Sequence, residues 1–294
     1  NLLTSLGFNE TMANSLTKED YISFSKNLKT EFNVSMLNPL SNDLKVLRQS
    51  LLFSGLESIS YNLNRKNNSL KLYEFGKTYH KYDHGYQEDK HLTIFISGAR
   101  TKDTWTNPSQ NSDFFYLKGI IRSILERIGV SNLKTSPIKT DVFSEGIVFS
   151  LGKKKLVEFG VVSKQIRKEF GIKQEVLFAD FDWSTILLIS GNKKIKVSNL
   201  TKFPSVKRDL ALLLDEKVTF KEIYDLAFQS ERNLLKDVDL FDVYQGDKLP
   251  EGKKSYAVSF VLQDQNKTLE DRQIDKIMQK LQQSFEKNLE AVLR

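Results

Sequence analysis

The order of helices and strands in the last third of the chain constrains the fold most. Alternating apolar and polar residues predict strands over 208–215, 238–244 and 254–262, and 289–293 can form a closing strand. Apolar residues at helical spacing predict two helices, the first striped by Phe220, Ile223, Tyr224 and Ala227, the second by Ile274, Ile277, Leu281 and Phe285. Thr219 stands where it can cap the first helix. The predicted order is therefore βαββαβ within about 95 residues.

This order is the ferredoxin-like supersecondary pattern. In the strand over 254–262, alternation places one set of large residues under the helices: Tyr256, Val258, Phe260 and Leu262. The opposite face carries the small residues Ser255, Ala257 and Ser259 and is suited to being open. In the neighbouring strand, Phe241 and Val243 share one face, and Asp242 and Tyr244 share the other.

An open sheet face with a tyrosine beside small residues is a common way of stacking unpaired nucleobases. The alternation is equally consistent with a Tyr244 that only covers the sheet surface. The pattern alone leaves both interpretations open.

The first two thirds mix strands and helices without a regular βαβ repeat. Helices are predicted over 50–64, from Ser112 and Asp113 to Gly129, and over 163–170, with a short helix opening at Thr17 under a side-chain cap. Strands are predicted over 8–16, 34–37, 72–79, 92–99, 134–138, 146–151, 156–162 and 176–181, and a loop over 100–111. This order favours an α+β domain on an antiparallel sheet over residues 1–197, with a second domain over 198–294.

Composition excludes several classes of protein. Of 294 residues, 39% are hydrophobic and 28% charged, which is typical of a folded globular chain. There is no cysteine, so a disulfide scaffold, a thiolate metal site and a cysteine nucleophile are excluded. No uncharged apolar run approaches the ~18 residues that cross a bilayer.

The net charge of +7 is unevenly distributed. From Lys202 onward there are 16 basic and 17 acidic residues, a net of −1, so the preceding residues carry 44−16 = 28 basic and 37−17 = 20 acidic residues, a net of +8. A basic balance indicates an anionic partner such as nucleic acid.

Motifs for catalysis are absent from the sequence. It contains neither a P-loop nor a G-x-G-x-x-G segment, and it offers no nucleophile–histidine pair. His80, His84 and His91 lie close in sequence, but no Cys or Glu stands at ligand spacing, so a structural role is favoured over a zinc site. We therefore predict no catalytic, cofactor-binding or metal-binding residues. The chain begins at Asn1, without Met and within a helical pattern, which suggests a fragment truncated at its N-terminus.

Several ordered motifs resemble one family. In the last third they are Phe203-Pro204-Ser205-Val206-Lys207-Arg208-Asp209-Leu210-Ala211, Leu240-Phe241-Asp242-Val243-Tyr244-Gln245-Gly246, Gly252-Lys253-Lys254-Ser255-Tyr256-Ala257 and Thr268-Leu269-Glu270-Asp271. Upstream they are Leu6-Gly7-Phe8, Asn38-Pro39-Leu40-Ser41, Leu47-Arg48-Gln49-Ser50-Leu51-Leu52 and Leu72-Tyr73-Glu74-Phe75-Gly76-Lys77. The chain resembles the C-terminal part of bacterial phenylalanyl-tRNA synthetase β subunits, in which a catalytic-like domain precedes a ferredoxin-fold anticodon-binding domain.

The resemblance implies a class II synthetase-like antiparallel sheet domain over 1–197 that carries no active site. Arg48-Gln49 stands where class II motif 2 would show Arg-x-Glu, and no Gly-rich segment ending in Glu-Arg resembles motif 3. ATP phosphates would then lack their charge partners. The resemblance further implies a catalytic α subunit as partner in an α2β2 assembly, the cytoplasm as location, and ATP and magnesium as cofactors of the whole enzyme rather than of this chain.

For the last domain the resemblance implies binding of the anticodon region of tRNA-Phe. Tyr244 would stack a base, Asp242 would accept from a base edge, and Ser255 would bond to RNA backbone or base. Arg208 is a fourth RNA-binding candidate, although Arg208 and Asp209 could instead pair with each other or across the sheet.

Two other functions remain open from sequence. The first is a freestanding RNA-binding or adaptor protein built from the same domains. The second is a small-molecule sensor, because ferredoxin-like folds also bind amino acids.

Overall fold

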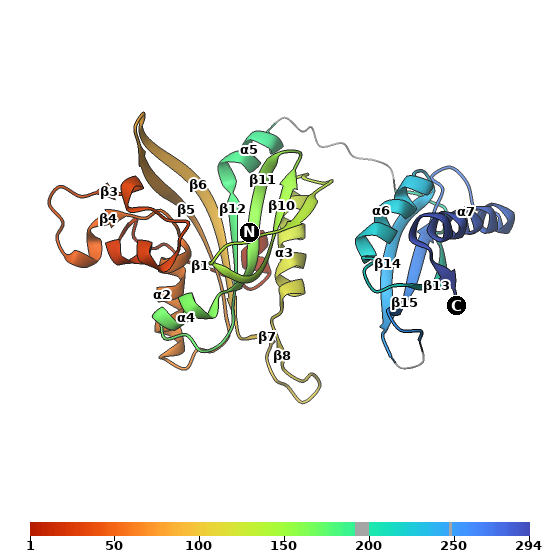
Figure 1. Cartoon of the computed structure of the whole chain (residues 1–294), viewed down its shortest axis with the longest axis horizontal. Coiled ribbons are helices and arrows are strands. Elements are labelled where there is room, and N and C mark those ends of the chain that lie inside the picture. Colours follow the sequence, from red (N-terminus) through yellow and green to blue (C-terminus); the bar gives the residue numbers. More distant parts are fainter. Residues whose placement is uncertain (192–199, 247–248) are drawn as a thin grey trace. The chain divides into compact units, whose positions relative to one another are not determined.

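The computed structural model describes residues 1–191, 200–246 and 249–294. The chain divides into two compact units, Asn1–Ile195 and Lys196–Arg294 (Figure 1). The boundary predicted near Ser198 lies outside the described residues.

The N-terminal unit is built on a seven-stranded sheet. Its order is β1 (Asn9–Glu10), β5 (Leu70–Tyr82), β6 (Gly85–Ser97), β12 (Val176–Asp182), β11 (Lys154–Val162), β10 (Phe143–Leu151) and β9 (Lys134–Pro137). β1 runs parallel to β5, and every other neighbouring pair is antiparallel. The predicted α+β class with an antiparallel sheet is confirmed.

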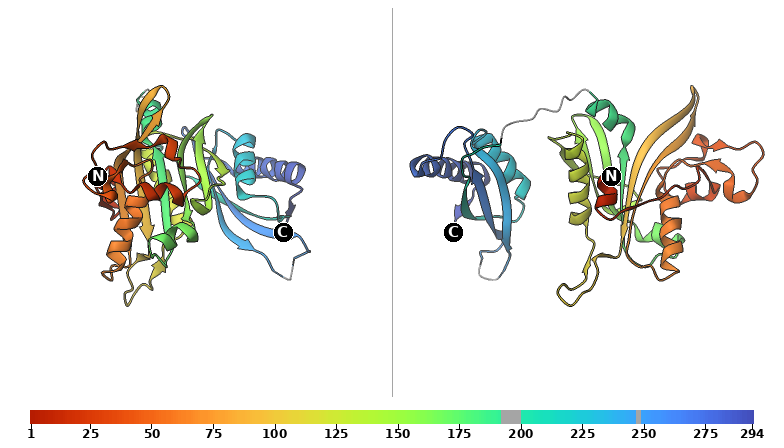
Figure 2. Two further views of the ribbon diagram at one scale, coloured as in Figure 1. Left: turned by 60° about the vertical axis from the view of Figure 1, so that its left-hand side comes forward. Right: turned by 180° about the vertical axis from the view of Figure 1, so that it is seen from behind.

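Helices pack on both faces of this sheet (Figures 1 and 2). One core lies under α1 (Leu2–Ser5), α3 (Phe114–Arg127) and α5 (Trp183–Ser190). The other lies under α2 (Leu52–Leu63) and α4 (Lys164–Glu169). The apolar stripes explain this arrangement, because Leu117, Ile121 and Leu125 of α3 are fully buried on one side of their helix. Asp113 caps α3 by accepting a hydrogen bond from the backbone N–H of Tyr116, 2.7 Å away.

Short elements complete the N-terminal unit. A small sheet joins β2 (Leu16–Thr17), β4 (Val46–Leu47) and β3 (Val34–Ser35), the 3₁₀ helices are η1 (Glu19–Phe24), η2 (Thr30–Phe32) and η3 (Asn42–Leu44), and β7 (Ala99–Thr101) pairs with β8 (Gln110–Asn111). The single strand predicted over 8–16 is wrong, because β1 joins the large sheet and β2 the small one.

Three further local predictions were wrong or incomplete. The helix expected at Thr17 is the 3₁₀ helix η1, and no side chain caps it. The expected loop over 100–111 contains the β7–β8 hairpin. Helix α5 was not predicted, since its apolar run lacks helical periodicity; Asp182 caps it by accepting from the N–H of Thr185 at 2.9 Å.

The C-terminal unit has the predicted βαββαβ order. Its sheet runs β14 (Leu235–Tyr244), β15 (Lys253–Leu262), β13 (Val206–Asp215) and β16 (Val292–Leu293), all antiparallel. Its helices are α6 (Phe220–Ser230) and α7 (Asp271–Leu289). Thr219 and Glu222 form a reciprocal capping box at the start of α6.

The core of this unit lies between the helices and one face of the sheet. It contains the predicted residues of β15, which are Tyr256, Val258, Phe260 and Leu262, together with the α7 stripe of Ile274, Ile277, Leu281 and Phe285. Across the described ranges, no helix is both long and apolar enough to span a membrane.

Candidate nucleic-acid interface

Strand register divides the C-terminal sheet into a helix-covered face and an open face. Tyr244 pairs with Ser255 and Asp242 with Ala257, whereas Val243 pairs with the buried Tyr256. Directly opposed residues of antiparallel strands point to the same side. Three of the four predicted RNA-binding residues, Asp242, Tyr244 and Ser255, therefore share the face that points away from the core.

We call this side of the sheet the open face. Its register positions are Lys207, Asp209, Ala211, Leu213 and Asp215 on β13, Lys253, Ser255, Ala257, Ser259 and Val261 on β15, Asp237, Asp239, Asp242 and Tyr244 on β14, and Val292 on β16.

The Tyr244 ring is partly accessible and has defined neighbours. Tyr244 is 36% exposed. A Cβ added to Gly246 would stand 2.7 Å from the Tyr244 Oη and 2.8 Å from its Cζ, so the glycine lets the backbone approach the ring. The guanidinium carbon of Arg294 lies 5.5 Å from the ring centroid, within cation–π range.

The serines of the open face are less accessible than expected. Ser255 is 7% exposed and Ser259 is 1% exposed. Ser255 lies in the second strand of the sheet, between its register partners Leu213 and Tyr244, whose longer side chains flank it. Ser259 Oγ donates to Asp209 Oδ1 at 2.7 Å, so Asp209 pairs across the sheet. The expectation that these small residues leave the surface open is therefore wrong at both serines.

Arg208 lies on the other face. It pairs in register with Phe260, a core residue, and its Nη2 is 3.7 Å from Asp271 Oδ1 at the start of α7. The structure thus does not bring Arg208 together with Asp242, Tyr244 and Ser255. Its RNA-binding role stays a prediction.

Phe241 is an aromatic residue of the open face that sequence reasoning placed with Val243. A bulge between Leu240 and Asp242 interrupts the alternation of β14 at Phe241. Phe241 is 53% exposed, and Lys207 Nζ lies 5.6 Å from its ring centroid. Because Lys207 occupies an open-face position, Phe241 lies on this face too. Such a bulge has no reliable sequence signal.

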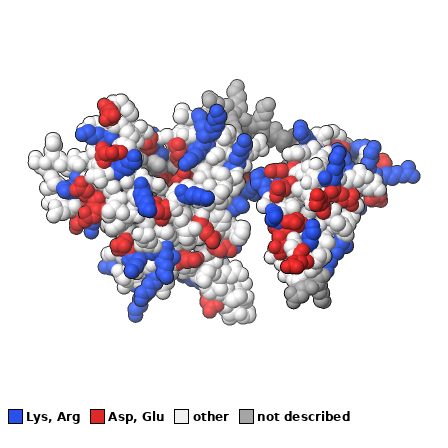
Figure 3. Space-filling view, viewed as in Figure 1, with Lys and Arg blue, Asp and Glu red and all other residues white. Residues whose placement is uncertain are grey.

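Charge on the C-terminal unit is mixed. Acidic and basic side chains are interspersed over it in Figure 3, and its sequence from Lys202 is near neutral. The register positions of the open face hold five carboxylates against two lysines, namely Asp209, Asp215, Asp237, Asp239 and Asp242 against Lys207 and Lys253. Since phosphate attraction supplies most non-specific affinity for nucleic acids, this face is better suited to contacting bases than to gripping a backbone.

In the N-terminal unit, the two residues that resemble motif 2 are used inside the protein. Arg48 Nη1 lies 2.7 Å from Glu74 Oε1, with the two side chains 4% and 2% exposed, and Arg48 Nε donates to the Lys77 carbonyl at 3.1 Å. Gln49 Nε2 donates to Asn33 Oδ1 at 2.7 Å. Burial raises the pKa of Glu74, although Arg48 acts to lower it.

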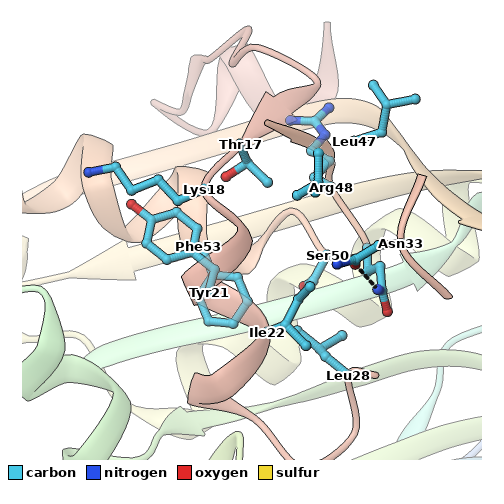
Figure 4. Close-up of a pocket in the computed structure, with 12 residues that line it drawn as sticks. Thr17, Lys18, Tyr21, Ile22, Leu28, Asn33, Leu47, Arg48, Ser50 and Phe53 are labelled. Carbon is cyan, nitrogen blue, oxygen red and sulfur yellow. Dashed lines mark hydrogen bonds between the residues drawn. The ribbon is translucent and has the colours of Figure 1, made fainter. Parts of the chain in front are cut away.

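The cavities beside these residues do not fit a nucleotide. The pocket of Figure 4, which Arg48 lines, has a volume of about 10 Å³, room for about one water. A neighbouring cavity of about 170 Å³ is lined by the carboxylates Glu158 and Asp180, and its described lining contains neither Lys nor Arg. Triphosphate oxygens would meet like charge there. We therefore derive no catalytic step through ATP on this chain.

The three histidines serve different contacts. His80 and His84 stack on either side of Tyr82 along the β5–β6 hairpin, with ring centroids 5.9 Å and 5.3 Å from that of Tyr82. His91 Nδ1 lies 2.7 Å from Asp180 Oδ1. Burial acts to lower the pKa of His91, but Asp180 outweighs it and the pKa is raised. Within the described residues, no group of three His, Asp or Glu side chains could hold a metal ion.

Solved structures define the class of fold. A pyrrolysyl-tRNA synthetase from Desulfitobacterium hafniense superposes with a TM-score of 0.51 and 16% identity over 65% of this chain and 65% of that chain. A second structure of that enzyme gives the same TM-score with 15% identity over 65% and 66%. At this identity the likeness shows a shared synthetase-like fold and nothing more.

Sequence comparisons define the family. The family model described as phenylalanyl tRNA synthetase beta chain CLM domain matches residues 1–183, and the one described as ferredoxin-fold anticodon binding domain matches residues 201–294. The chain therefore belongs to the phenylalanyl-tRNA synthetase β chain family, as its motifs predicted.

Relatives named phenylalanine–tRNA ligase beta subunit match along the whole chain. That of Bacteroides thetaiotaomicron is 45% identical over 99% of this chain, that of Porphyromonas gingivalis 42% over 99%, and that of Dehalococcoides mccartyi 31% over 100%. The chain spans 37%, 37% and 36% of these relatives, respectively.

Proposed function

We propose that this chain is the non-catalytic C-terminal portion of a phenylalanine–tRNA ligase β subunit, and that its C-terminal unit binds the anticodon region of tRNA-Phe. The observation that carries the proposal is the grouping of Tyr244, Asp242 and Phe241 on an open sheet face, within the segment that matches an anticodon-binding family. Anticodon bases are unpaired, so their flat faces and edges are accessible to such a surface.

Each side chain has a role that its chemistry supports. The Tyr244 ring stacks a base, and the Asp242 carboxylate accepts from an exocyclic amine on a base edge. Ser255, flanked by Tyr244, can reach only a group that lies directly above it. We leave Arg208 out of this contact because it lies on the helix-covered face.

We further propose that the N-terminal unit serves as a scaffold for a catalytic α subunit in an α2β2 assembly. Support comes from the synthetase-like fold combined with the internal use of Arg48 and Gln49. ATP and magnesium would then act on the partner subunit, in the cytoplasm where proteins are made. The family matches give no support to a freestanding RNA-binding or adaptor protein.

A filter-binding titration tests the RNA contact. The 294-residue chain is titrated against a tRNA-Phe transcript and against the same transcript with its anticodon replaced. We expect weak binding to tRNA-Phe, because the unit is near neutral, and weaker binding to the altered transcript. Equal binding to both transcripts would contradict an anticodon site.

Light scattering tests the scaffold. The chain is mixed with its cognate α subunit and the mass of the product is measured, with a full-length β subunit as control. A complex supports the scaffold role. If the full-length β subunit assembles and this chain does not, these residues do not hold the α subunit by themselves. In a pyrophosphate-exchange assay, activation of phenylalanine by the purified chain alone would overturn the non-catalytic assignment.

A further inference from the structure

Arg294 reaches across the open face to Tyr244. Its backbone N–H donates to the Ala211 carbonyl at 3.0 Å, which fixes it beside β16 at the far edge of the sheet from β14. Three strand spacings, roughly 14 Å, separate these edges, and an extended arginine and an extended tyrosine together can span that distance. The guanidinium meets the ring at 5.5 Å from its centroid.

Small residues make this crossing possible. Ala211 and Ala257 are register partners on the two central strands, and Asp242 is the next partner in the same row. A longer side chain at either alanine position would stand in the path from Arg294 to Tyr244. On the two central strands this row therefore carries only methyl side chains, and it lies next to the row of the predicted base-stacking residue Tyr244.

The contact has a consequence for RNA binding. A base that stacks on the Tyr244 ring from the side of Arg294 must displace the guanidinium. The phosphate of the same nucleotide would also come close to Asp242, and a carboxylate repels it unless a cation lies nearby. Arg294 is the cation that already contacts this ring, and its planar guanidinium matches phosphate oxygens in a bidentate way.

We propose that Arg294 is a further RNA-binding residue of the open face, which leaves the Tyr244 ring when a base stacks there and pairs with that nucleotide's phosphate. This inference rests on the proposed function. It also explains how a face whose register positions carry five aspartates can accept RNA beside Tyr244.

The salt dependence of binding tests the inference. Fluorescence anisotropy is measured for the 294-residue chain with a labelled anticodon stem-loop of tRNA-Phe at several KCl concentrations, using wild type, Arg294→Ala, Arg294→Lys and Arg272→Ala. Arg272 is an exposed arginine on α7, against the opposite face, and is the matched control. Thermal melts check that each variant is folded.

Loss of one phosphate contact to single-stranded RNA lowers the slope of log K against log salt by about 0.7. We therefore expect Arg294→Ala to bind the stem-loop more weakly than wild type at low salt. The ratio of wild-type affinity to variant affinity should fall roughly threefold for a fourfold rise in salt. Arg294→Lys should keep the slope, because it keeps the charge, and Arg272→Ala should match wild type.

The outcomes separate the inference from the proposed function. If wild type does not bind the stem-loop, the proposed function fails. If wild type binds and Arg294→Ala has the same affinity and slope, only the role of Arg294 fails. Tighter binding by Arg294→Ala at every salt concentration would show that the guanidinium merely obstructs the ring, and would also overturn the inference.

Discussion

In the N-terminal unit helices cover both faces of the sheet, whereas in the C-terminal unit α6 and α7 cover only one face of a four-stranded sheet. The polar groups of the two sheets differ accordingly. Arg48 and Glu74 are almost fully buried and form an ion pair. Tyr244 and Phe241 remain partly exposed, and each has a cation over its ring.

The difference teaches how the partners of a side chain limit what else that side chain can bind. A guanidinium that is committed to a buried carboxylate cannot also bind phosphate, since withdrawing it would leave an uncompensated buried charge. The neighbours of an exposed aromatic ring can be displaced without leaving a buried charge unpaired, so a base can take their place. The first arrangement supports structure and the second supports recognition.

The largest effect is expected at Arg48. Arg48→Met leaves the Glu74 carboxylate buried without its partner, so we expect the free energy of unfolding of the N-terminal unit to fall by about 3–5 kcal/mol. Both tryptophans, Trp105 and Trp183, lie in this unit, so urea unfolding followed by tryptophan fluorescence reports on it alone.

Two further variants sharpen this prediction. Replacing Glu74 by Leu in the same chain should restore most of the loss, because an apolar pair of similar volume often substitutes for a buried ion pair. Arg122→Ala, on the exposed side of α3, should change stability by less than about 0.5 kcal/mol. If the double variant Arg48→Met with Glu74→Leu is no more stable than Arg48→Met alone, loss of the ion pair is not the cause of the destabilisation.

The next effect is expected at Tyr244. Tyr244→Ala removes the proposed stacking surface, so binding of tRNA-Phe in the filter assay should weaken by about 1–3 kcal/mol, with stability nearly unchanged. Tyr224 on α6 is 38% exposed, close to the 36% of Tyr244, and serves as control. Equal losses in the two variants would argue against a specific stack on the open face.

A smaller, pH-dependent effect is expected at His91. Because the folded pKa is raised, the charged contact with Asp180 stabilises fully below the unfolded value of about 6.5, and this contribution is lost as pH rises through the folded pKa. His91→Gln should therefore destabilise the N-terminal unit by roughly 1–2 kcal/mol more at pH 5.5 than at pH 8.5.

The same urea titration by tryptophan fluorescence measures this difference. Leu188→Gln, at an exposed position of α5, replaces no titratable group and should show no such dependence. A deficit for His91→Gln that is independent of pH would mean that His91 contributes only packing.

The smallest effect is expected at Asp242. Asp242→Ala should weaken binding of the anticodon stem-loop by about 0.5–1.5 kcal/mol, because a base amine loses its acceptor. Asp242→Asn keeps an acceptor oxygen and should bind at least as well as wild type. Asp239→Ala removes the same charge from the same strand and face. If Asp242→Ala and Asp239→Ala both tighten binding, Asp242 only repels phosphate.

The periodicity of apolar residues correctly predicted the longer helices and strands, in which the pattern recurs several times. The stripes of α3 and α7 and the alternation of β15 place their large residues in the cores where the sequence predicts them. Short elements were less predictable, because two residues of β1 or β2 carry no period and owe their structure to the strands that they pair with. The same holds for α5, whose apolar run is compatible with a buried strand or a buried helix.

The candidate site was likewise predictable in part. Alternation over β14 and β15 was sufficient to place Asp242, Tyr244 and Ser255 on one face, because a side chain's face follows from its position in the strand. It could not show that Ser255 is covered, that Phe241 joins the face through a bulge, or that Arg208 turns toward Asp271. These depend on the sizes and partners of residues far apart in the chain.

The sequence by itself determined the βαββαβ order and the family, since local periods and ordered motifs are properties of consecutive residues. Only the tertiary structure decided that Arg48 is held by Glu74 and that Arg294 reaches Tyr244 over two alanines. The physical reason is that an ion pair or a cation–π contact acts over a few ångströms between residues brought together by folding, and nothing in their sequence separation specifies it.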